Sequence, residues 1–363
     1  MCCVPWSSLA SAVGFHHRPG FLPLVALSSI LLSCLLLLDA CGEAADRDAP
    51  IVITGATMGT TYAVKLYDAN SDVETDALQS EIDDLLERIN DQMSTWRPDS
   101  ELSRFNKSRD PGWFPVSAET ATVVDAAQTI SVLSTGAFDV TVGPVVNLWG
   151  FGPGRSDAAP PSIQQIESAM KRVGYRQLAV RASPSALRKQ HPDMYVDLSA
   201  IAKGFAVDEL ARLLDARHIA SYLVEIGGEL RGHGSKPDGS PWKVAIEQPL
   251  SGERSAQNVV ALRDTAIATS GDYRNYVEMD GKRYSHTINP RTGRPIAHGL
   301  ASVSVVTASA MRADALATAI MVMGPEEGYR FAEREALAVQ LIIRVADRFQ
   351  VLATPQFDSY VLR

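Results

Sequence analysis

The order of helical and strand patterns limits most strongly what this chain can fold into. Apolar residues recur at helical spacing in several segments before residue 217 and again after residue 309, whereas residues 222–306 contain mostly short runs typical of strands. A parallel sheet with crossover helices would need a regular alternation of strands and helices, which this chain does not show. The pattern therefore predicts an α+β fold.

The helix predictions rest on spacing and on capping residues. In the first helix, at 74–92, apolar residues from Leu78 to Met93 fall on one face. Another helix is expected at 199–216. Serines that can cap a first turn and glycines that can end a last turn bound three more helices, which run from Ser117 to Gly136, from Ser162 to Gly174 and from Ser309 to Gly324.

The strand predictions rest on alternation and on runs of branched residues. Residues 60–67 alternate clearly, and Asp280-Gly281 marks the turn of a hairpin at 275–286. The remaining predicted strands are 138–142, 195–198, 242–247, 259–262, 266–269, 303–307, 339–345 and 350–353.

The first forty residues differ from the rest of the chain. An apolar run at 21–38 follows Arg18 and contains Pro23. Its length approaches that of a transmembrane helix, but the proline and the Leu-Asp-Ala-Cys-Gly sequence at 38–42 favour a lipoprotein signal, in which Cys41 becomes the lipid-bearing N-terminus. Cys34 is a weaker alternative, because lipidation there would leave leucines on the mature end. We predict a signal peptide at 1–40, a lipidated cysteine with a polar tether at 41–50, and one domain at 51–363.

Charge and cysteine content exclude several classes of protein. The formal net charge is −8, so we expect no basic surface for nucleic acid. The cysteines are Cys2, Cys3, Cys34 and Cys41. The mature domain therefore contains no disulfide, no thiol nucleophile and no cysteine metal site.

Common nucleotide-binding and hydrolase motifs are absent. The sequence contains neither a GxxxxGK[ST] phosphate loop nor a GxGxxG run after a strand, and the glycine-rich segment at 150–154 has the wrong spacing. It also contains no HExxH zinc motif and no GxSxG nucleophile elbow. A nucleotide would therefore have to be bound by a less familiar architecture.

A set of segments mixes polar residues, glycines and aromatics beyond what a core requires. Taken singly, each has an ordinary structural explanation, such as a half-buried surface aromatic for Trp96 or a strand bend for Gly227-Gly228. The segments are 58–61, 93–100, 138–144, 197–204, 226–229, 270–273, 286–293 and 313–319.

Together these segments resemble the ApbE family of FAD:protein FMN transferases, in order and spacing, through the whole mature chain. The most diagnostic are His-Thr-Ile-Asn-Pro at 286–290 with the following Thr292-Gly293, and Ala-Asp-Ala-Leu-Ala-Thr at 313–318. The resemblance implies an ApbE-like single mixed α/β domain at 51–363 that acts as a flavin transferase. A threonine hydroxyl of an acceptor protein would attack the FMN phosphorus of FAD, and AMP would leave.

The resemblance also implies a Mg²⁺ site. Asp314 and Thr318 stand four residues apart on a predicted helix, so the carboxylate and the hydroxyl point the same way. Such hard oxygen ligands suit Mg²⁺. By resemblance, the carbonyl of Ala200 is a further ligand, and Ala317 can offer only its carbonyl where some relatives have a side-chain ligand. The alternative places Asp314 on a solvated helix face.

For the base that accepts the threonine proton, we expect His286. Its unperturbed pKa, about 6.5, leaves a useful neutral fraction at pH 7. Asp272 or a phosphate oxygen of FAD is the alternative.

The resemblance assigns FAD contacts to ten residues in six segments. Among them, Trp96 could stack on the flavin or lie along its edge, Asp197 could accept hydrogen bonds from a base edge, and Lys203 could meet a phosphate as a point charge. The structural alternatives are core packing and helix capping. The ten are Met58, Trp96, Arg97, Pro98, Ala137, Phe138, Asp139, Asp197, Lys203 and Ile288.

The resemblance further implies a partner and a location. The acceptor would be a subunit of a membrane redox complex, and the enzyme would sit on the periplasmic side of a bacterial membrane, held there by a lipid on Cys41. Two other functions stay open. Water could replace the threonine, which would make the protein an FAD pyrophosphatase, or the chain could be a non-catalytic flavin-binding lipoprotein. The Asp314/Thr318 pair argues against the carrier, because flavin storage needs no metal.

Overall fold

The computed structural model describes residues 49–67, 73–153, 159–249, 255–272, 276–279, 282–346 and 348–362. The predicted signal peptide, Cys41 and the Asp280-Gly281 turn lie outside these residues. The chain from Asp48 to Arg363 forms one compact unit. Within the described part, no helix combines the length and the apolar composition needed to span a bilayer.

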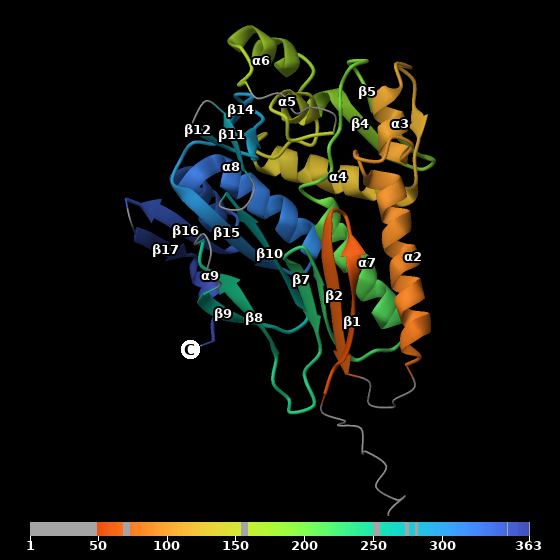
Figure 1. Ribbon diagram of the computed structural model, residues 1–363, viewed down its shortest axis with the longest axis vertical. Helices are drawn as coiled ribbons and strands as arrows, with labels where there is room; N and C mark the ends of the chain where they lie inside the picture. Colours follow the sequence, from red (N-terminus) through yellow and green to blue (C-terminus); the bar gives the residue numbers. More distant parts are fainter. Residues whose placement is uncertain are drawn as a thin grey trace, which may run out of the picture. The chain divides into compact units, whose positions relative to one another are not determined.

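A large antiparallel sheet forms the centre of this unit (Figure 1). Every neighbouring pair of its strands is antiparallel. The strands, in their spatial order, are β1 (Ile51–Thr57), β2 (Thr60–Tyr67), β6 (Ser221–Ile226), β7 (Glu229–His233), β10 (Thr265–Gly271), β15 (Leu300–Thr307), β16 (Ala338–Val345) and β17 (Arg348–Ala353). Helices cover it without βαβ alternation, which confirms the predicted α+β fold.

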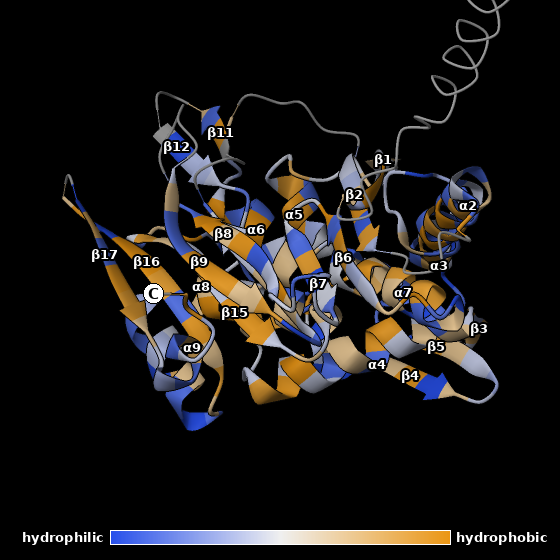
Figure 2. Cartoon of the chain, turned by 90° about the horizontal axis from the view of Figure 1, so that it is seen from below, coloured by the Kyte–Doolittle hydropathy of each residue, from blue (hydrophilic) through white to orange (hydrophobic). Residues whose placement is uncertain are grey.

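Alternate residues of the central strands belong to two apolar clusters, one on each face of the sheet. In β6, Tyr222 and Val224 face one cluster and Leu223 faces the other, as the period of two in a strand requires. The first cluster is covered by α2 (Thr75–Met93), α4 (Ala118–Leu133), α7 (Ala202–Ala216) and α8 (Ala310–Arg334). The second is covered by β8 (Trp242–Glu247), β9 (Ala256–Leu262) and α9 (Pro355–Asp358). Figure 2 shows the hydrophobic residues concentrated in these central elements.

Smaller elements cluster beside the helical layer. One three-stranded sheet has the order β3-β5-β4. A third apolar cluster is formed by Val145, Trp149, Ile166, Ala169 and Ile288. The small elements are α3 (Glu101–Lys107), β3 (Phe114–Pro115), α5 (Gly143–Leu148), α6 (Ile163–Met170), the 3-10 turn Tyr175–Gln177, β4 (Leu178–Ala182), β5 (Ser185–Lys189), β11 (Tyr276–Met279), β12 (Lys282–Ser285), β13 (Ile288–Asn289) and β14 (Arg294–Pro295).

The three predicted serine caps are confirmed. Ser117, Ser162 and Ser309 each accept a hydrogen bond from the main-chain N–H three residues on, at the start of α4, α6 and α8. Gly324, with φ 80° and ψ −178°, interrupts α8 ahead of Pro325. The predicted helix from Ser309 therefore ends where expected, and a second helical segment follows it.

Two predicted strands are wrong. Residues 138–142 form a turn, because the Asp139 carboxylate accepts hydrogen bonds from the N–H (2.8 Å) and the hydroxyl (2.6 Å) of Thr141 and so bends the chain. Residues 195–198 are extended but make only an isolated bridge, between Tyr195 and Val142. The helix predicted at 199–216 begins at Ala202, after a turn. Strand β1 and helix α3 were not predicted.

Candidate active site

The contact between α7 and α8 organises the site. Gly204 faces the start of α8 so closely that a Cβ there would lie 2.3 Å from the carbonyl oxygen of Ala310. A glycine is therefore needed for the two backbones to meet. The N–H of Gly204 donates to Asp314 Oδ2 at 3.1 Å, so the same contact fixes the predicted metal ligand.

Asp208, also in α7, binds the first residues of α8. Its carboxylate accepts hydrogen bonds from the N–H groups of Ala310 and Met311, both at 3.0 Å, and from the Ser309 hydroxyl at 2.7 Å. It also pairs with Arg231 of β7 at 2.7 Å. An anion at a helix N-terminus is favourable, so Asp208 anchors the start of α8 to α7.

Asp314 is buried, with 4% of its surface exposed. The alternative of a solvated helix face is therefore wrong. One turn further along α8, Thr318 is half-buried, and its hydroxyl lies 3.2 Å from that of Ser270 at the end of β10. The described structure thus brings a carboxylate and two hydroxyls to one end of the sheet.

A buried ion pair adjoins Asp314. Glu229 begins β7, directly after the turn formed by Gly227 and Gly228, whose φ values are 58° and 101°. Its Oε2 lies 2.5 Å from the Nζ of Lys203, in the first turn of α7. The Glu229 side chain is almost fully buried and that of Lys203 is partly buried.

The cluster contains two buried carboxyl groups and one lysine, and burial disfavours the ionised form of both carboxyls. Burial raises the pKa of Asp314, although Lys203 and the Gly204 N–H oppose the shift. Burial also raises the pKa of Glu229, to about 8, against the opposing effect of Lys203 and with a further contribution from Asp314. Burial would lower the pKa of Lys203, but the two carboxylates outweigh it and raise that pKa. A cation placed here would therefore be stabilised.

The donors present fit Mg²⁺. They are hard oxygens, which Mg²⁺ prefers, and it commonly takes only one or two protein carboxylates together with substrate phosphates. Among the described residues, no group of three or more His, Cys, Asp or Glu side chains could hold a metal ion. The predicted ligands Ala200, in the turn before α7, and Ala317, buried in α8, could contribute only carbonyl oxygens.

Asp272 is near Ser270 in the sequence. It follows β10 two residues after Ser270, and its N–H donates to the carbonyl of Ala301 at 3.1 Å. Its Oδ1 is buried and has no hydrogen-bond partner within the described residues. Such an oxygen is available to accept a proton or a hydrogen bond from a substrate.

The predicted base, His286, lies beside an aromatic ring. It falls between β12 and β13, and its ring is 6.4 Å from that of Phe151, edge to face. Ile288, a predicted FAD contact, follows in β13 and is buried against Trp149 and Val145. The structure therefore places His286 beside Phe151 and Ile288 against side chains of α5 and α6.

Two predicted FAD segments are joined by their main chains. The N–H of Asp197 donates to the carbonyl of Val140 at 2.8 Å, and the Asp197 carboxylate accepts from the N–H of Ser199 at 2.9 Å. Ala137 and Phe138, just before this loop, are buried in the main core. Segment 137–140 thus lies against the chain that leads to Ala200 and Lys203.

Asp139 is occupied within its own loop. Besides its two bonds with Thr141, its carboxylate accepts the N–H of Tyr175 at 2.8 Å. Burial raises its pKa, against these hydrogen bonds. The described role of Asp139 is therefore to shape the loop, and its contact with FAD stays a prediction.

The remaining predicted FAD contacts lie on surface turns. Met58 adopts φ 50° in the β1–β2 turn. Trp96 is 67% exposed, as a stacking platform would need to be. Pro98 accepts a hydrogen bond from Lys107 through its carbonyl, at 2.6 Å.

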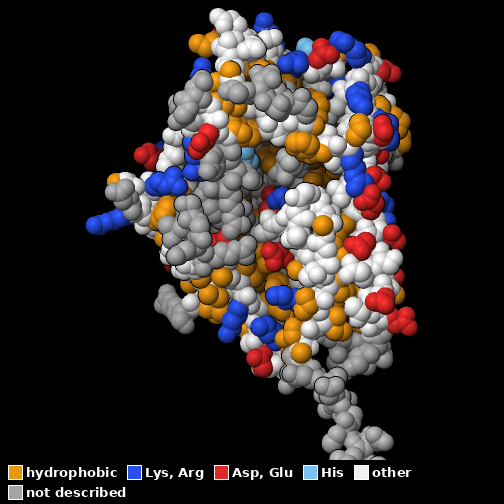
Figure 3. All heavy atoms as spheres, viewed as in Figure 1, with side chains coloured by type: hydrophobic (Ala, Val, Ile, Leu, Met, Phe, Trp, Pro, Cys, Tyr) orange, Lys and Arg blue, Asp and Glu red, His pale blue; other side chains and the backbone are white. Residues whose placement is uncertain are grey.

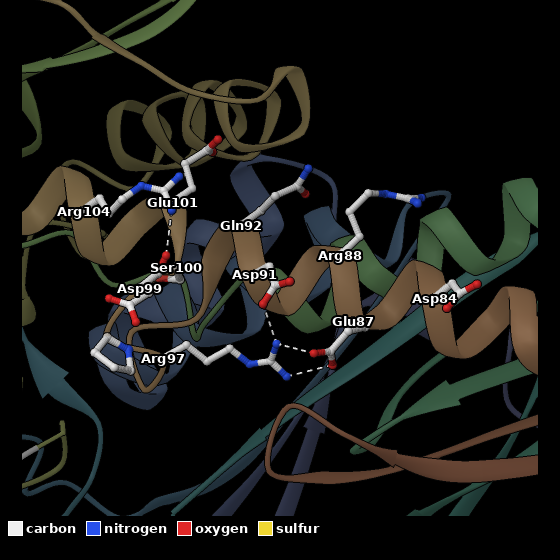
Figure 4. A pocket seen from close by; sticks show the side chains of 11 residues that line it. Asp84, Glu87, Arg88, Asp91, Gln92, Arg97, Asp99, Ser100, Glu101 and Arg104 are labelled. Carbon is white, nitrogen blue, oxygen red and sulfur yellow. Dashed lines mark hydrogen bonds and ion pairs between the residues drawn. The ribbon is translucent and has the colours of Figure 1, made fainter.

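Arg97 is held by two acidic side chains of α2. Its guanidinium bonds both oxygens of Glu87, at 2.6 and 2.8 Å, and Asp91 at 2.5 Å. Figure 4 shows these bonds within an open groove between α2 and α3, on the edge where charged side chains gather in Figure 3. The groove contains Arg97 and Pro98 but none of Lys203, Glu229 and Asp314.

Sequence reasoning missed four residues that build the site. Gly204 and Glu229 fell inside segments that had been singled out, but neither received a role. Ser270 was likewise in such a segment. Asp208 carried no signal at all, because a capping residue that comes from another helix leaves no local pattern.

Known proteins resemble this chain over most of its length. Residues 58–343 match the family model described as ApbE family. The FAD:protein FMN transferase of Vibrio cholerae serotype O1 is 46% identical over 332 residues, which span 92% of this chain and 98% of the relative. That of Salmonella typhimurium is 42% identical, over 92% of this chain and 97% of the relative.

Solved structures show the same likeness. The flavin transferase ApbE from Vibrio cholerae superposes with a TM-score of 0.80 at 46% identity and covers 86% of this chain and 99% of its own. The apo form of Pseudomonas stutzeri flavinyl transferase ApbE gives a TM-score of 0.79 at 42% identity, over 86% of this chain and 97% of its own.

Proposed function

The chain belongs to the ApbE family, and from this premise we propose that it transfers FMN from FAD to a threonine hydroxyl of an acceptor protein, with the help of Mg²⁺. The enzyme class, FAD:protein FMN transferase, follows from its relatives. The observation that supports the metal-assisted chemistry is the buried Asp314, one turn from Thr318 and beside the Lys203–Glu229 pair.

The proposed reaction is a phosphoryl transfer. The threonine oxygen forms a bond to the FMN phosphorus of FAD, and the bond from that phosphorus to the bridging pyrophosphate oxygen breaks. The bridging oxygen leaves with AMP, and the threonine proton passes to a base. Positioning and charge stabilisation are the main contributions that a protein makes to such a reaction.

The residues of the buried cluster divide these tasks. Asp314, Thr318 and the carbonyls of Ala200 and Ala317 would hold Mg²⁺. When bound, Mg²⁺ neutralises charge on the pyrophosphate and on the leaving AMP. Lys203 would present its ammonium to a phosphate oxygen, and Glu229 would hold that ammonium in place.

For the base we propose His286, with Asp272 as the alternative. A histidine side chain can accept a proton near neutral pH, whereas Asp272 offers a buried oxygen that has no hydrogen-bond partner among the described residues. Flavin and adenine contacts are proposed for the exposed Trp96 and for Asp197. The other proposed FAD contacts are Met58, Arg97, Pro98, Ala137, Phe138, Asp139 and Ile288.

We also propose the location and the partner. Cys41 would carry a lipid that holds the enzyme on the periplasmic side of a bacterial membrane. Its acceptor would be a subunit of a membrane redox complex that displays the modified threonine.

Release of AMP tests the reaction. The protein is incubated with FAD and Mg²⁺, with and without a threonine-bearing acceptor. AMP that appears only with acceptor supports the transferase. AMP without acceptor would make the protein a pyrophosphatase, and no AMP in either case would make it a flavin carrier.

Two variants test the metal site. Asp314→Asn keeps the size of the side chain but removes its charge, so we expect no turnover at ordinary Mg²⁺ concentrations. Thr318→Val removes a neutral ligand, and excess Mg²⁺ or Mn²⁺ should partly rescue it. Asp238→Asn, which removes a charge from an exposed turn, is the control and should stay active. Full activity of Asp314→Asn, or wild-type activity in excess EDTA, would contradict the metal role.

A further inference from the structure

A second buried polar cluster lies beside the segment that carries Asp197. Asn106, in α3, is 9% exposed. Its amide makes both possible hydrogen bonds with the main chain of Val196, Nδ2 donating to the carbonyl at 2.8 Å and Oδ1 accepting from the N–H at 2.8 Å. One side chain thus replaces the two bonds that a neighbouring strand would make.

Lys189 completes this cluster. It ends β5, is 3% exposed, and donates from Nζ to the carbonyls of Asn106 at 2.8 Å and Met194 at 3.1 Å. The same ammonium lies 5.2 Å from the centroid of the Phe105 ring. Among the described residues Lys189 makes no ion pair with a carboxylate. Burial lowers its pKa to about 8, with Asp193 opposing this shift and Arg109 adding to it.

Burying a lysine without a paired acid costs free energy. The two hydrogen bonds that Lys189 donates to the main chain offset part of this cost. They join the last residue of α3's buried face to the segment 194–196. In Figure 1, α3 and β5 lie next to each other in the small-element region. The cluster therefore holds the extended chain of 194–196 from one side.

The opposite side of that chain is held by the loop that contains Asp139. The N–H of Asp197 bonds the carbonyl of Val140, and Tyr195 forms a bridge with Val142. The chain then turns through Ser199 to Ala200 and into α7. Any sideways shift at Val196 would therefore be transmitted both to Asp197 and to the loop of 137–140.

Helix α3 also leads back to the exposed Trp96. Ser100 caps α3, accepting from the N–H of Ser103 at 3.0 Å, and its own hydroxyl donates to the carbonyl of Ser94 at 2.6 Å. The turn of 96–98 is thereby fixed to the start of α3. Asn106, six residues later, connects this turn to the Asp197 segment.

We propose that Asn106 and Lys189 are positioning residues of the FAD site, which set the distance between the Trp96 turn and the Asp197 segment without touching FAD themselves. This inference rests on the proposed function, because it takes both segments as FAD contacts. If so, disturbing the cluster should weaken FAD binding more than it slows the chemistry at Asp314.

Two variants test this on the full-length protein. Asn106→Asp keeps the shape of the side chain but places a carboxylate oxygen against the Val196 carbonyl. Lys189→Met keeps the apolar stem over Phe105 and removes both donated bonds. We expect each to raise the Kd for FAD, measured by flavin fluorescence, and the KM for FAD about tenfold, the factor for one hydrogen bond to FAD lost through misplacement of its partner. The kcat at saturating FAD should change less than threefold.

A matched control separates positioning from general stability. Thr354 is also fully buried, and its hydroxyl bonds the main chain of Leu337 and Val339, which lie outside the predicted FAD segments. Thr354→Val should lower the melting temperature as the two variants do but leave the Kd for FAD unchanged.

The outcomes distinguish the positioning role of Asn106 and Lys189 from the proposed function. If wild type binds FAD and both variants match it in Kd and KM, the positioning inference is wrong while the proposed function stands. If kcat falls as much as KM rises, the cluster serves the chemistry and the inference is also wrong. A wild type that binds no FAD would overturn the proposed function and this inference with it. Should Asn106→Asp not fold, Lys189→Met decides alone.

Discussion

Replacing Gly204 by alanine tests the contact that places Asp314. The added Cβ would lie 2.3 Å from the oxygen and 2.6 Å from the carbon of the Ala310 carbonyl, and 2.7 Å from the Cα of Met311. These are backbone atoms of α8, so no side chain can rotate away. An ordinary contact needs about 3.5 Å, so α7 and α8 would have to separate by about 1 Å.

Two effects of opposite sign determine how much Gly204→Ala changes the free energy of unfolding. Alanine is favoured over glycine inside a helix by about 1 kcal/mol. Forcing extra volume into a packed contact typically costs about 1–3 kcal/mol, and three backbone clashes place this site at the upper end of that range. We therefore expect Gly204→Ala to lower the free energy of unfolding by about 1–2 kcal/mol, or the melting temperature by roughly 2–3 °C for a domain of this size.

The separation should also affect Asp314. The N–H of residue 204 would move away from Oδ2, which it now meets at 3.1 Å. We expect the Mg²⁺ concentration for half-maximal AMP release to rise severalfold, since the carboxylate loses its fixed orientation.

Calorimetry and a Mg²⁺ titration of AMP release measure both effects. Gly112→Ala serves as the control, because its new Cβ would meet only the Asp110 carboxyl group, and its stability should change by less than about 0.5 kcal/mol. A Gly204→Ala protein as stable as wild type, with unchanged Mg²⁺ dependence, would show that the close contact of α7 and α8 does not place Asp314.

Three further predictions concern the base, the buried pair and the anchor. His286→Ala should slow flavin transfer by about 10²- to 10⁴-fold with little change in FAD affinity; an equal loss in both would make His286 a binding residue. Burial raises the pKa of Glu229 from 4.5 to about 8, and a carboxyl whose pKa is higher in the folded state loses stability as the pH rises between these values. The metal-free wild type should therefore become less stable from pH 5 to pH 8 in thermal unfolding, and Glu229→Gln should show a flatter profile; parallel profiles would contradict the raised pKa. Cys41→Ala should leave an uncleaved precursor, whereas mass spectrometry that finds an unmodified Cys41 inside a longer mature chain would rule out the lipoprotein signal.

Local signals in the sequence predicted most of the helices correctly. A capping serine and the N–H that it accepts are three residues apart, as at Ser117 and Ser309, so the signal lies in one short stretch. The spacing of Asp314 and Thr318 is equally local, because one helical turn separates them. The failed strand at 138–142 shows the limit of such signals, since its apolar alternation was overruled by the bonds of the Asp139 carboxylate.

The amino-acid sequence alone indicated the α+β class, the serine caps at three helix starts and, through the resemblance, the set of segments that build the site. Only the tertiary structure decided which residues of those segments meet. Gly204 bonds Asp314 across 110 residues, Asp208 caps a helix that begins 101 residues later at Ser309, and Glu229 reaches Lys203 only because a strand and a helix pack together. Periodicity and caps act within a few residues and are visible in the sequence, whereas these contacts depend on how closely two backbones pack, which no local pattern records.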